Sequence, residues 1–126
     1  MGSMLTRLFA LKFRKRRRYQ AKSGLYVVPE NSYGKNQIGD IGMGGLSFYY
    51  VDSGLVFHKK QYALTLMADG TKSGVKVSCT TVSDAEAGES VFQNQRIKRR
   101  SVRFERMSLQ QKRKLRRLIR DYTTGR

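Results

Sequence analysis

Five consecutive basic residues occupy positions 14–18 of this 126-residue chain, and the first and last of them, Arg14 and Arg18, are arginines. The guanidinium group carries a planar fork of donors that matches phosphate oxygens and the O6/N7 edge of guanine, and its face can stack on a purine. Further along the chain, Asp40 places a carboxylate acceptor in the glycine-rich stretch 38–46, where small residues allow a flat ligand to approach the backbone. These residue types favour the binding of an anionic, planar ligand.

The charge of the whole chain also indicates an anionic partner. The sequence carries 26 Lys and Arg against 9 Asp and Glu, which gives a formal net charge of +17. Such an excess favours nucleic acid, an acidic membrane surface or a phosphate-bearing ligand, and the charge alone does not choose among them. Hydrophobic residues make up 39% of the chain, which is enough for the core of one domain.

Few residues in the sequence are suited to catalysis or to holding a metal. The single cysteine, Cys79, excludes an internal disulfide, and with the single histidine, His58, it leaves too few ligands for an ordinary zinc site. We interpret His58 as an exposed imidazole and Cys79 as a small buried core residue. We interpret Asp84, Glu86 and Glu89 as a solvated acidic turn. The sequence therefore predicts a binding protein without a metal or a cofactor, and not an enzyme.

The N-terminal segment is short and of mixed character. Residues 1–3, followed by Met4, resemble a cloning scar. Residues 4–13 are apolar but are interrupted by two cations, so this segment is expected to be helical or flexible and not to span a membrane. A soluble, cytoplasmic protein is expected on this basis.

The elements that must position Arg18 and Asp40 are mainly strands. Runs with an apolar residue at every second position, or with clustered β-branched residues, predict strands at Leu25–Val28, Leu46–Tyr50, Gln61–Met67, Val75–Thr80 and Ser101–Arg106. Turn-forming residues fill 31–36, and 84–90 is expected to be a loop. The glycine-rich stretch lacks the Lys and Ser/Thr of a P-loop and runs into a strand, so it predicts a tight connection between two strands.

The C-terminal part of the chain changes to a helical period. Ser108 and Gln111 form a capping-box pattern, and apolar side chains then recur at helical spacing over Leu109–Tyr122. Most of the remaining positions are basic. We interpret them as a solvated face above a stripe that packs on the strands, while contact with acidic lipid or an acidic partner stays open. Six or so short strands with this helix predict a small β-barrel or sandwich.

The ordered pair of motifs resembles the signature of the PilZ domain family, which is R-x-x-x-R followed by (Asp/Asn)-x-(Ser/Ala)-x-x-Gly. Here Arg14-x-x-x-Arg18 is followed by Asp40-x-Gly42-x-x-Gly45, which runs into a strand. The likeness extends to the C-terminal helix. It implies a mainly β fold, namely a six-stranded antiparallel β-barrel with a C-terminal amphipathic α-helix.

The resemblance also implies where the domain lies. It assigns residues 14–122 to the PilZ-like domain and leaves 123–126 as a tail. Within the basic run, Tyr19 favours the register that uses Arg18, because the family tends to have an apolar or aromatic residue directly after its second arginine. In this register Arg16 and Arg17 lie between the two arginines of the motif and have no assigned role.

The ligand implied by the resemblance is the bacterial second messenger cyclic di-GMP. Arg14 and Arg18 are assigned to phosphate and guanine contacts, Asp40 to the guanine N1–H and N2–H₂ edge, and Gly45 to a close approach of the ligand. Gly42 stands where the family has Ser or Ala. Because the family tolerates alanine there, the position needs only a small residue, and binding is expected to survive.

A switching mechanism and two alternatives follow from the same residues. The Arg-rich segment is expected to fold over the bound dinucleotide and to alter the surface that a downstream protein partner reads. In the first alternative, a basic small β-barrel binds nucleic acid through residues 7–18 and 96–120. In the second, a PilZ-like domain serves protein interaction and binds no nucleotide.

Overall fold

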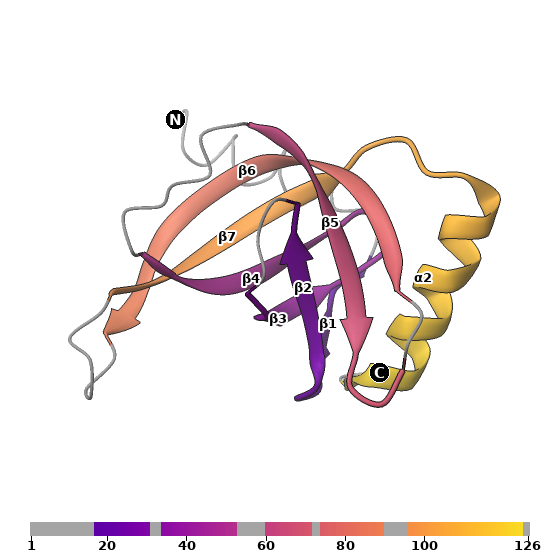
Figure 1. Cartoon of the computed structure of the whole chain (residues 1–126), viewed down its shortest axis with the longest axis horizontal. Helices are drawn as coiled ribbons and strands as arrows, with labels where there is room; N and C mark the ends of the chain where they lie inside the picture. The colour runs from indigo at the N-terminus through magenta and orange to yellow at the C-terminus, as the bar shows by residue number, and fades with distance from the viewer. Residues whose placement is uncertain (1–16, 31–33, 53–59, 72–73, 90–95, 125–126) are drawn as a thin grey trace, which may run out of the picture.

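The computed structural model shows strands wrapped into a barrel with one helix at its side (Figure 1). The residues that it describes are 17–30, 34–52, 60–71, 74–89 and 96–124. Arg14, His58 and the segment 4–13 lie outside the described residues. Within the described ranges, no helix is long and apolar enough to cross a membrane.

Six strands close into a barrel, and two short strands extend its sheet. The elements are β1 (Tyr19–Ala21), β2 (Leu25–Pro29), β3 (Asn36–Ile41), β4 (Gly45–Asp52), β5 (Gln61–Ala68), β6 (Val75–Glu89), β7 (Arg96–Phe104), α2 (Leu109–Tyr122) and β8 (Thr123–Thr124). The ring runs β2-β5-β6-β7-β4-β3 and closes where β3 pairs back with β2. Neighbouring strands are antiparallel, β1 pairs with β3, and β8 pairs with β1. The predicted six-stranded barrel with a C-terminal helix is confirmed.

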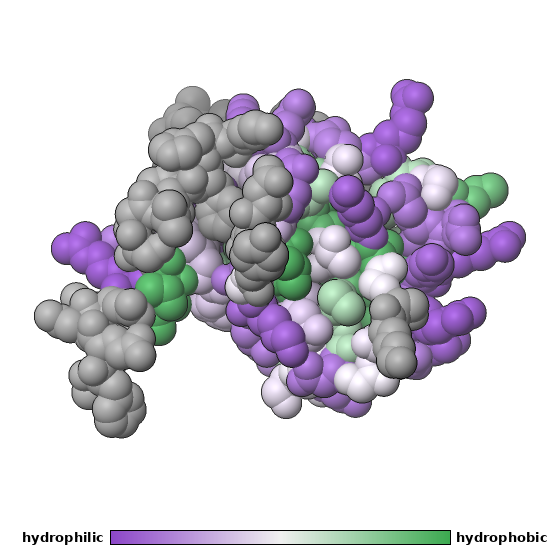
Figure 2. All heavy atoms as spheres, viewed as in Figure 1, coloured by the Kyte–Doolittle hydropathy of each residue, from purple (hydrophilic) through white to green (hydrophobic). Residues whose placement is uncertain are grey.

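Side-chain alternation along the strands builds the core inside the barrel. The buried apolar side chains of β4, β5 and β6 recur at every second position, as predicted: Leu46, Phe48, Tyr50, Tyr62, Leu64, Leu66, Val75, Val77 and Cys79. Cys79 is fully buried, which confirms its interpretation as a core residue. Burial of each large apolar side chain contributes about 1.5–3 kcal/mol before the cost of ordering. In the view of Figure 2, hydrophilic side chains dominate the described surface, with hydrophobic ones visible between them.

Helix α2 begins and packs as its sequence pattern predicts. Ser108 accepts a hydrogen bond from the Gln111 backbone N–H at 3.1 Å, and the Gln111 side chain accepts one from the Ser108 N–H at 2.7 Å. The capping box thus satisfies two backbone donors at the helix start. Leu115, Leu118 and Ile119 are buried against the barrel, where α2 lies beside β6 and the short strands β1 and β8 (Figure 1).

The segment 84–90 is not a loop as far as the structure describes it, because Asp84–Glu89 forms the second half of β6. In this half, acidic residues stand opposite basic residues of β7, with Asp84 facing Arg100 and Glu86 facing Lys98. Cross-strand pairs of opposite charge stabilise a ladder that has little apolar content of its own. The prediction failed because the strand partner, and not local periodicity, determines this pairing.

Three further segments differ from the sequence prediction. The last barrel strand begins at Arg96 and ends at Phe104, so it starts earlier than the predicted run 101–106. Asn36, which was placed in a turn, opens strand β3, which contains Asp40. Thr123 and Thr124, which were assigned to a tail, form β8 against β1. These short segments are fixed by pairing with neighbours distant in sequence.

Candidate functional site

Arg18 and Asp40 meet because β1 pairs with β3. Arg18 directly precedes β1, and Tyr19 and Gln20 of β1 pair with Ile41 and Asp40 of β3. This register brings the Arg18 guanidinium to the carboxylate, with Nη1 3.1 Å from Asp40 Oδ1. Both side chains are about one-fifth exposed, so the ion pair lies at the surface of the barrel wall and not in its core.

Two further residues hold the Asp40 carboxylate. Ser47 on β4 donates its hydroxyl to Asp40 Oδ1 at 2.8 Å and accepts a hydrogen bond from the Asp40 backbone N–H at 3.2 Å. Arg99 on β7 places Nη2 3.2 Å from Asp40 Oδ2 and 2.9 Å from Ser47 Oγ. Its guanidinium also lies 5.5 Å from the centre of the Tyr49 ring, within the range of a cation–π contact. Asp40 is thus fixed between two arginines.

The glycine turn lies directly against these residues. The Gly42 N–H donates to the Gly45 carbonyl at 2.9 Å and closes the connection between β3 and β4. A Cβ at Gly42 would overlap the Arg17 carbonyl oxygen, and one at Gly45 would overlap the Val102 carbonyl oxygen. A Cβ at Gly45 would also lie 2.9 Å from an Arg18 guanidinium nitrogen. Both positions therefore need glycine, because protein backbone occupies the space beside them.

Close packing at Gly42 restricts this position to glycine, whereas the sequence indicated only that the residue must be small. A small residue was expected to suffice, since the family has Ser or Ala there. In this chain the Arg17 backbone rests on the turn, so even alanine needs a shift of the segment before β1. The structure brings Arg18, Asp40, Gly42 and Gly45 together, while Arg14 lies outside the described residues.

The arrangement presents arginine forks and an acceptor on one patch of the outer wall. A carboxylate offers about four lone-pair positions, and Arg18, Ser47 and Arg99 occupy three of them at Asp40. Arg17 is exposed next to the pair, with its guanidinium 5.8 Å from the Tyr19 ring centre. Such a patch can bind an anionic group through the arginines and a hydrogen-bond donor through the remaining lone pair or by partner exchange.

Sequence reasoning missed Ser47, Tyr49 and Arg99 as members of this patch. Ser47 and Tyr49 alternate with the buried apolar residues of β4 and so lie on its outer face, where Ser47 is covered and only 1% exposed. Arg99 lies opposite Tyr49 in the β4–β7 ladder. Period-two alternation could have placed the two β4 residues on the outer face. Nothing local distinguishes Arg99 from the other cations of its basic strand.

A second Arg–Asp cluster lies on the inner face of the same strands. Arg100 is 5% exposed, and its Nη2 lies 2.8 Å from Asp84 Oδ2. Tyr50 donates its hydroxyl to the same oxygen at 2.5 Å, and Lys98 Nζ lies 3.9 Å from Asp84 Oδ1. The Arg100 guanidinium also lies 5.5 Å from the Tyr50 ring centre and 5.9 Å from that of Tyr62. The interpretation of Asp84 as part of a turn is therefore wrong, since it lies in β6 and is paired, although its side chain stays 22% exposed.

The pKa values in the inner cluster reflect both burial and pairing. Burial and the hydrogen bond to Asp84 raise the pKa of Tyr50 to about 12. Burial alone would raise the pKa of Asp84, but the hydrogen bonds from Tyr50 and Arg100 outweigh it and leave this pKa below its usual value. The cluster thus holds a neutral phenol beside a charged carboxylate and guanidinium at neutral pH.

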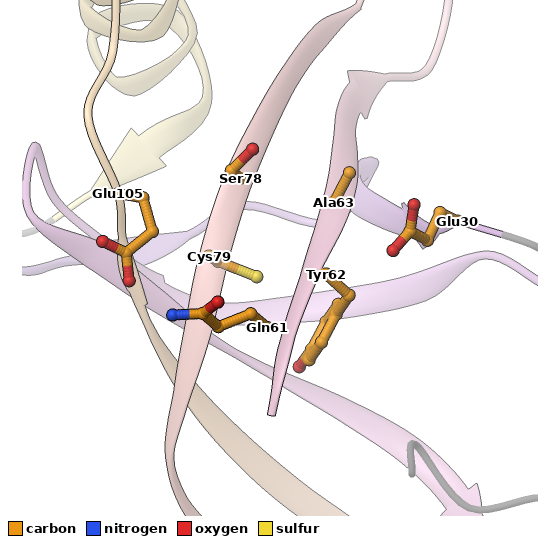
Figure 3. Close-up of a pocket in the computed structure, with 7 residues that line it drawn as sticks. All are labelled: Glu30, Gln61, Tyr62, Ala63, Ser78, Cys79 and Glu105. Carbon is orange, nitrogen blue, oxygen red and sulfur yellow. The ribbon is translucent and has the colours of Figure 1, made fainter. Parts of the chain in front are cut away.

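A cleft elsewhere on the wall carries two carboxylates and is therefore poorly suited to an anionic ligand. It measures about 480 Å³ and has Glu30 and Glu105 at opposite ends, with Gln61, Tyr62, Ala63, Ser78 and Cys79 between them (Figure 3). Thr80 donates a hydrogen bond to Glu105. Burial, followed by the charge of Glu105, raises the pKa of the Cys79 thiol to about 12, so it is not a thiolate nucleophile at neutral pH. In the described part of the chain, no three His, Cys, Asp or Glu residues form a group suited to a metal ion.

Comparison with solved structures identifies the fold. The PilZ domain of YcgR from Escherichia coli, solved with c-di-GMP, superposes with a TM-score of 0.65 at 18% identity and covers 86% of this chain and 90% of its own. The K. pneumonia MrkH–c-di-GMP complex gives a TM-score of 0.63 at 16% identity, over 86% of this chain and 51% of MrkH. PlzA of Borreliella burgdorferi in complex with c-di-GMP gives 0.58 at 12% identity, over 100% of this chain and 61% of PlzA.

Sequence comparison adds nothing to this result, since neither a family model nor a curated protein matches the chain. The likeness rests on the barrel, the helix and the order of the elements, which agree with the PilZ domain of YcgR over most of both chains. The chain therefore forms a PilZ-like domain.

Proposed function

We propose that this chain is a cyclic di-GMP receptor domain, with a binding role and no catalytic one. The observation that carries the proposal is that Arg18 meets Asp40 directly above the Gly42–Gly45 turn. Arg18 of the first motif half thus lies beside Asp40 of the second, although 22 positions separate them in the sequence. The similar structures of YcgR, MrkH and PlzA, each with c-di-GMP, support the choice of ligand.

The chemistry of the ligand fits the patch. Cyclic di-GMP carries two phosphates and two guanines, so it offers anionic oxygens and O6/N7 acceptors to arginine forks. The guanine N1–H and N2–H₂ edge needs an acceptor, which Asp40 supplies. Because the Asp40 pairs with Arg18 and Arg99 are part-exposed, either arginine can exchange the carboxylate for a ligand oxygen at small cost.

In the switch that we propose, the Arg-rich segment 14–18 folds over the bound dinucleotide, with Arg14 as the first arginine of the motif and Arg18 as the second. The Arg17 backbone against Gly42 supports this placement, since it shows that the chain can follow the turn closely. Folding of this segment over the ligand would change the outer surface beside β1 and β3, and a downstream protein partner would read that change. In this role the domain acts in the cytoplasm, where we propose the partner is also found.

Calorimetric titration tests the assignment of the ligand. Cyclic di-GMP is expected to bind the full chain saturably, while GTP and single-stranded DNA at the same concentrations give no comparable isotherm. An isotherm for single-stranded DNA that matches or exceeds that of cyclic di-GMP would favour the nucleic-acid barrel instead.

A PilZ-like interaction module that binds no nucleotide is the second candidate. It is favoured by the number of contacts that Asp40 already makes, since Arg18, Ser47 and Arg99 hold the carboxylate at once. In this second candidate, the contacts of Asp40 only hold the segment before β1 against β3. A folded chain with no heat of binding for cyclic di-GMP would support it.

A further inference from the structure

Helix α2 presents a row of arginines on the face opposite its buried stripe. Spacings of three, four and seven residues place side chains on one side of a helix, and four exposed arginines follow this spacing: Arg113, Arg116, Arg117 and Arg120. These four residues, called here the α2 arginine face, line a shallow groove of about 510 Å³. The apolar residues Leu115, Leu118 and Ile119 lie on the barrel side and are buried.

The α2 arginine face carries little compensating negative charge. Arg120 pairs with Asp121, with Nε 3.1 Å from Oδ1, but remains 63% exposed. Arg113, Arg116 and Arg117 make no ion pair with any of the described residues, and the first turn of the helix contains no acid. Cations spaced three and four residues apart repel one another along a helix. An anionic partner would relieve this repulsion.

The residue type and spacing favour a row of phosphates as the partner. The arginine fork binds phosphate oxygens in a bidentate manner, which the ammonium group of lysine does not match. With a rise of about 1.5 Å per residue, Arg113 and Arg120 are about 10 Å apart along the helix axis. One strand of a duplex advances about 3.4 Å along the duplex axis per phosphate, so this length matches about three steps from one phosphate to the next.

A membrane surface fits the same helix less well. A helix that binds lipid inserts its apolar face, but here Leu115, Leu118 and Ile119 are already covered by the barrel. Among the described residues of α2, Leu109 is the large hydrophobic side chain that remains exposed, at 73%. One leucine beside four arginines supplies little apolar area for insertion.

We infer that the α2 arginine face docks on the phosphate backbone of a double-stranded nucleic acid without reading its sequence. The binding energy comes from bidentate arginine–phosphate contacts and from the release of counterions. This surface belongs to α2, whereas the Asp40 patch belongs to β3, β4 and β7. The inference therefore stands whether or not the Asp40 patch binds cyclic di-GMP.

Fluorescence anisotropy with a short labelled DNA duplex of mixed sequence, measured over a series of salt concentrations, tests the inference. The triple variant R113Q/R116Q/R117Q is expected to bind the duplex at least tenfold more weakly. The slope of log affinity against log salt should become shallower by about 2.7, since each lost phosphate contact removes about 0.9. The matching R113K/R116K/R117K variant should keep the wild-type slope and lose affinity only a fewfold, because charge remains while the fork is lost.

The control variant K35Q/K60Q/R96Q removes the same charge from exposed positions outside α2. It should bind the duplex nearly as well as the wild type, and all variants should keep the wild-type Tm. An equal loss in the control would overturn the inference in favour of diffuse attraction. Wild-type binding to vesicles of phosphatidylcholine and phosphatidylglycerol that depends on these arginines, with no duplex binding, would overturn it in favour of a membrane surface.

Discussion

Arg99 and Arg100 are adjacent in β7, and each pairs with an aspartate on an opposite face of the barrel wall. On the outer face, Arg99 meets Asp40 with side chains 42% and 22% exposed. On the inner face, Arg100 meets Asp84 with side chains 6% and 22% exposed, and two tyrosine rings lie beside the guanidinium. Strand alternation alone sends two identical side chains into these two environments.

Exposure of the arginine, and not the type of ion pair, distinguishes the outer patch, for which we propose ligand binding, from the inner cluster. Removing one partner of a buried ion pair leaves an uncompensated charge in a medium that solvates it poorly. A part-exposed pair is screened by water and can be exchanged for another partner at small cost. The outer pair is thus suited to a ligand, while the inner pair is suited to holding β6 against β7.

Substitution of the inner arginine gives the largest expected effect. Arg100→Met should lower the free energy of unfolding by about 2 kcal/mol, because Asp84 loses its charge-assisted hydrogen bonds from the guanidinium but stays 22% exposed and 3.9 Å from Lys98 Nζ. Arg99→Met, one residue away, should lower it by less than about 1 kcal/mol. Urea denaturation of the two variants measures the difference, and equal losses would contradict the distinction between the two faces.

Substitution of Arg18 should affect ligand binding and leave stability nearly unchanged. Arg18→Ala should weaken cyclic di-GMP binding by tenfold or more, since an arginine fork on guanine contributes about 1–3 kcal/mol. Arg17→Ala is the matched control and should cost less, because Arg17 is exposed and makes no contact with Asp40 in the structure. Calorimetric titration of both variants measures these losses. An equal loss of affinity in the two variants would show that binding depends on total charge and not on Arg18 itself.

Restoring the family residue at the glycine turn should weaken the site. Gly42→Ala places a Cβ against the Arg17 carbonyl, and the segment before β1 must move away. The expected loss of stability is about 1 kcal/mol, the lower range for overpacking, because the displaced segment lies near the surface. Hydrogen exchange at Tyr19 and Gln20 should become faster in this variant. Unchanged exchange there would show that the turn accommodates a side chain without moving β1.

The smallest expected effect concerns alkaline stability. The folded state raises the pKa of Tyr50 to about 12 from its ordinary value of 10.0, so it favours the neutral phenol. The associated stabilisation is fully present below pH 10 and is lost as pH rises toward 12. Tyr50→Phe should flatten this alkaline decline without abolishing it, because the pKa of Cys79 is raised as well. Urea midpoints at pH 9 and 11 provide the measurement.

The fold was predictable where a local pattern is strong. The capping box at Ser108 and the apolar spacing of Leu115, Leu118 and Ile119 define α2 from neighbouring residues alone. Alternation likewise defines β4 and β5. The second half of β6 was mispredicted because its alternation is polar, and only the partner strand β7 shows that its acids are paired.

The candidate site was predictable only in part. Arg18, Asp40, Gly42 and Gly45 carry motif spacings that can be read from the sequence, and the structure brings them together. Arg99 carries no such spacing, because its place beside Asp40 depends on the register of β4 against β7. Long-range register is set by the closure of the barrel, which no local window contains.

The most direct test of the central claim is calorimetric titration of cyclic di-GMP into the wild-type chain, Asp40→Ala and Asp69→Ala. Asp69 also pairs with a cation, with Lys35 Nζ 3.7 Å from its Oδ1, but it lies outside the patch and its side chain is 67% exposed. We expect saturable binding to the wild type and to Asp69→Ala, and a loss of at least tenfold in Asp40→Ala. Equal affinity for all three proteins would contradict the account.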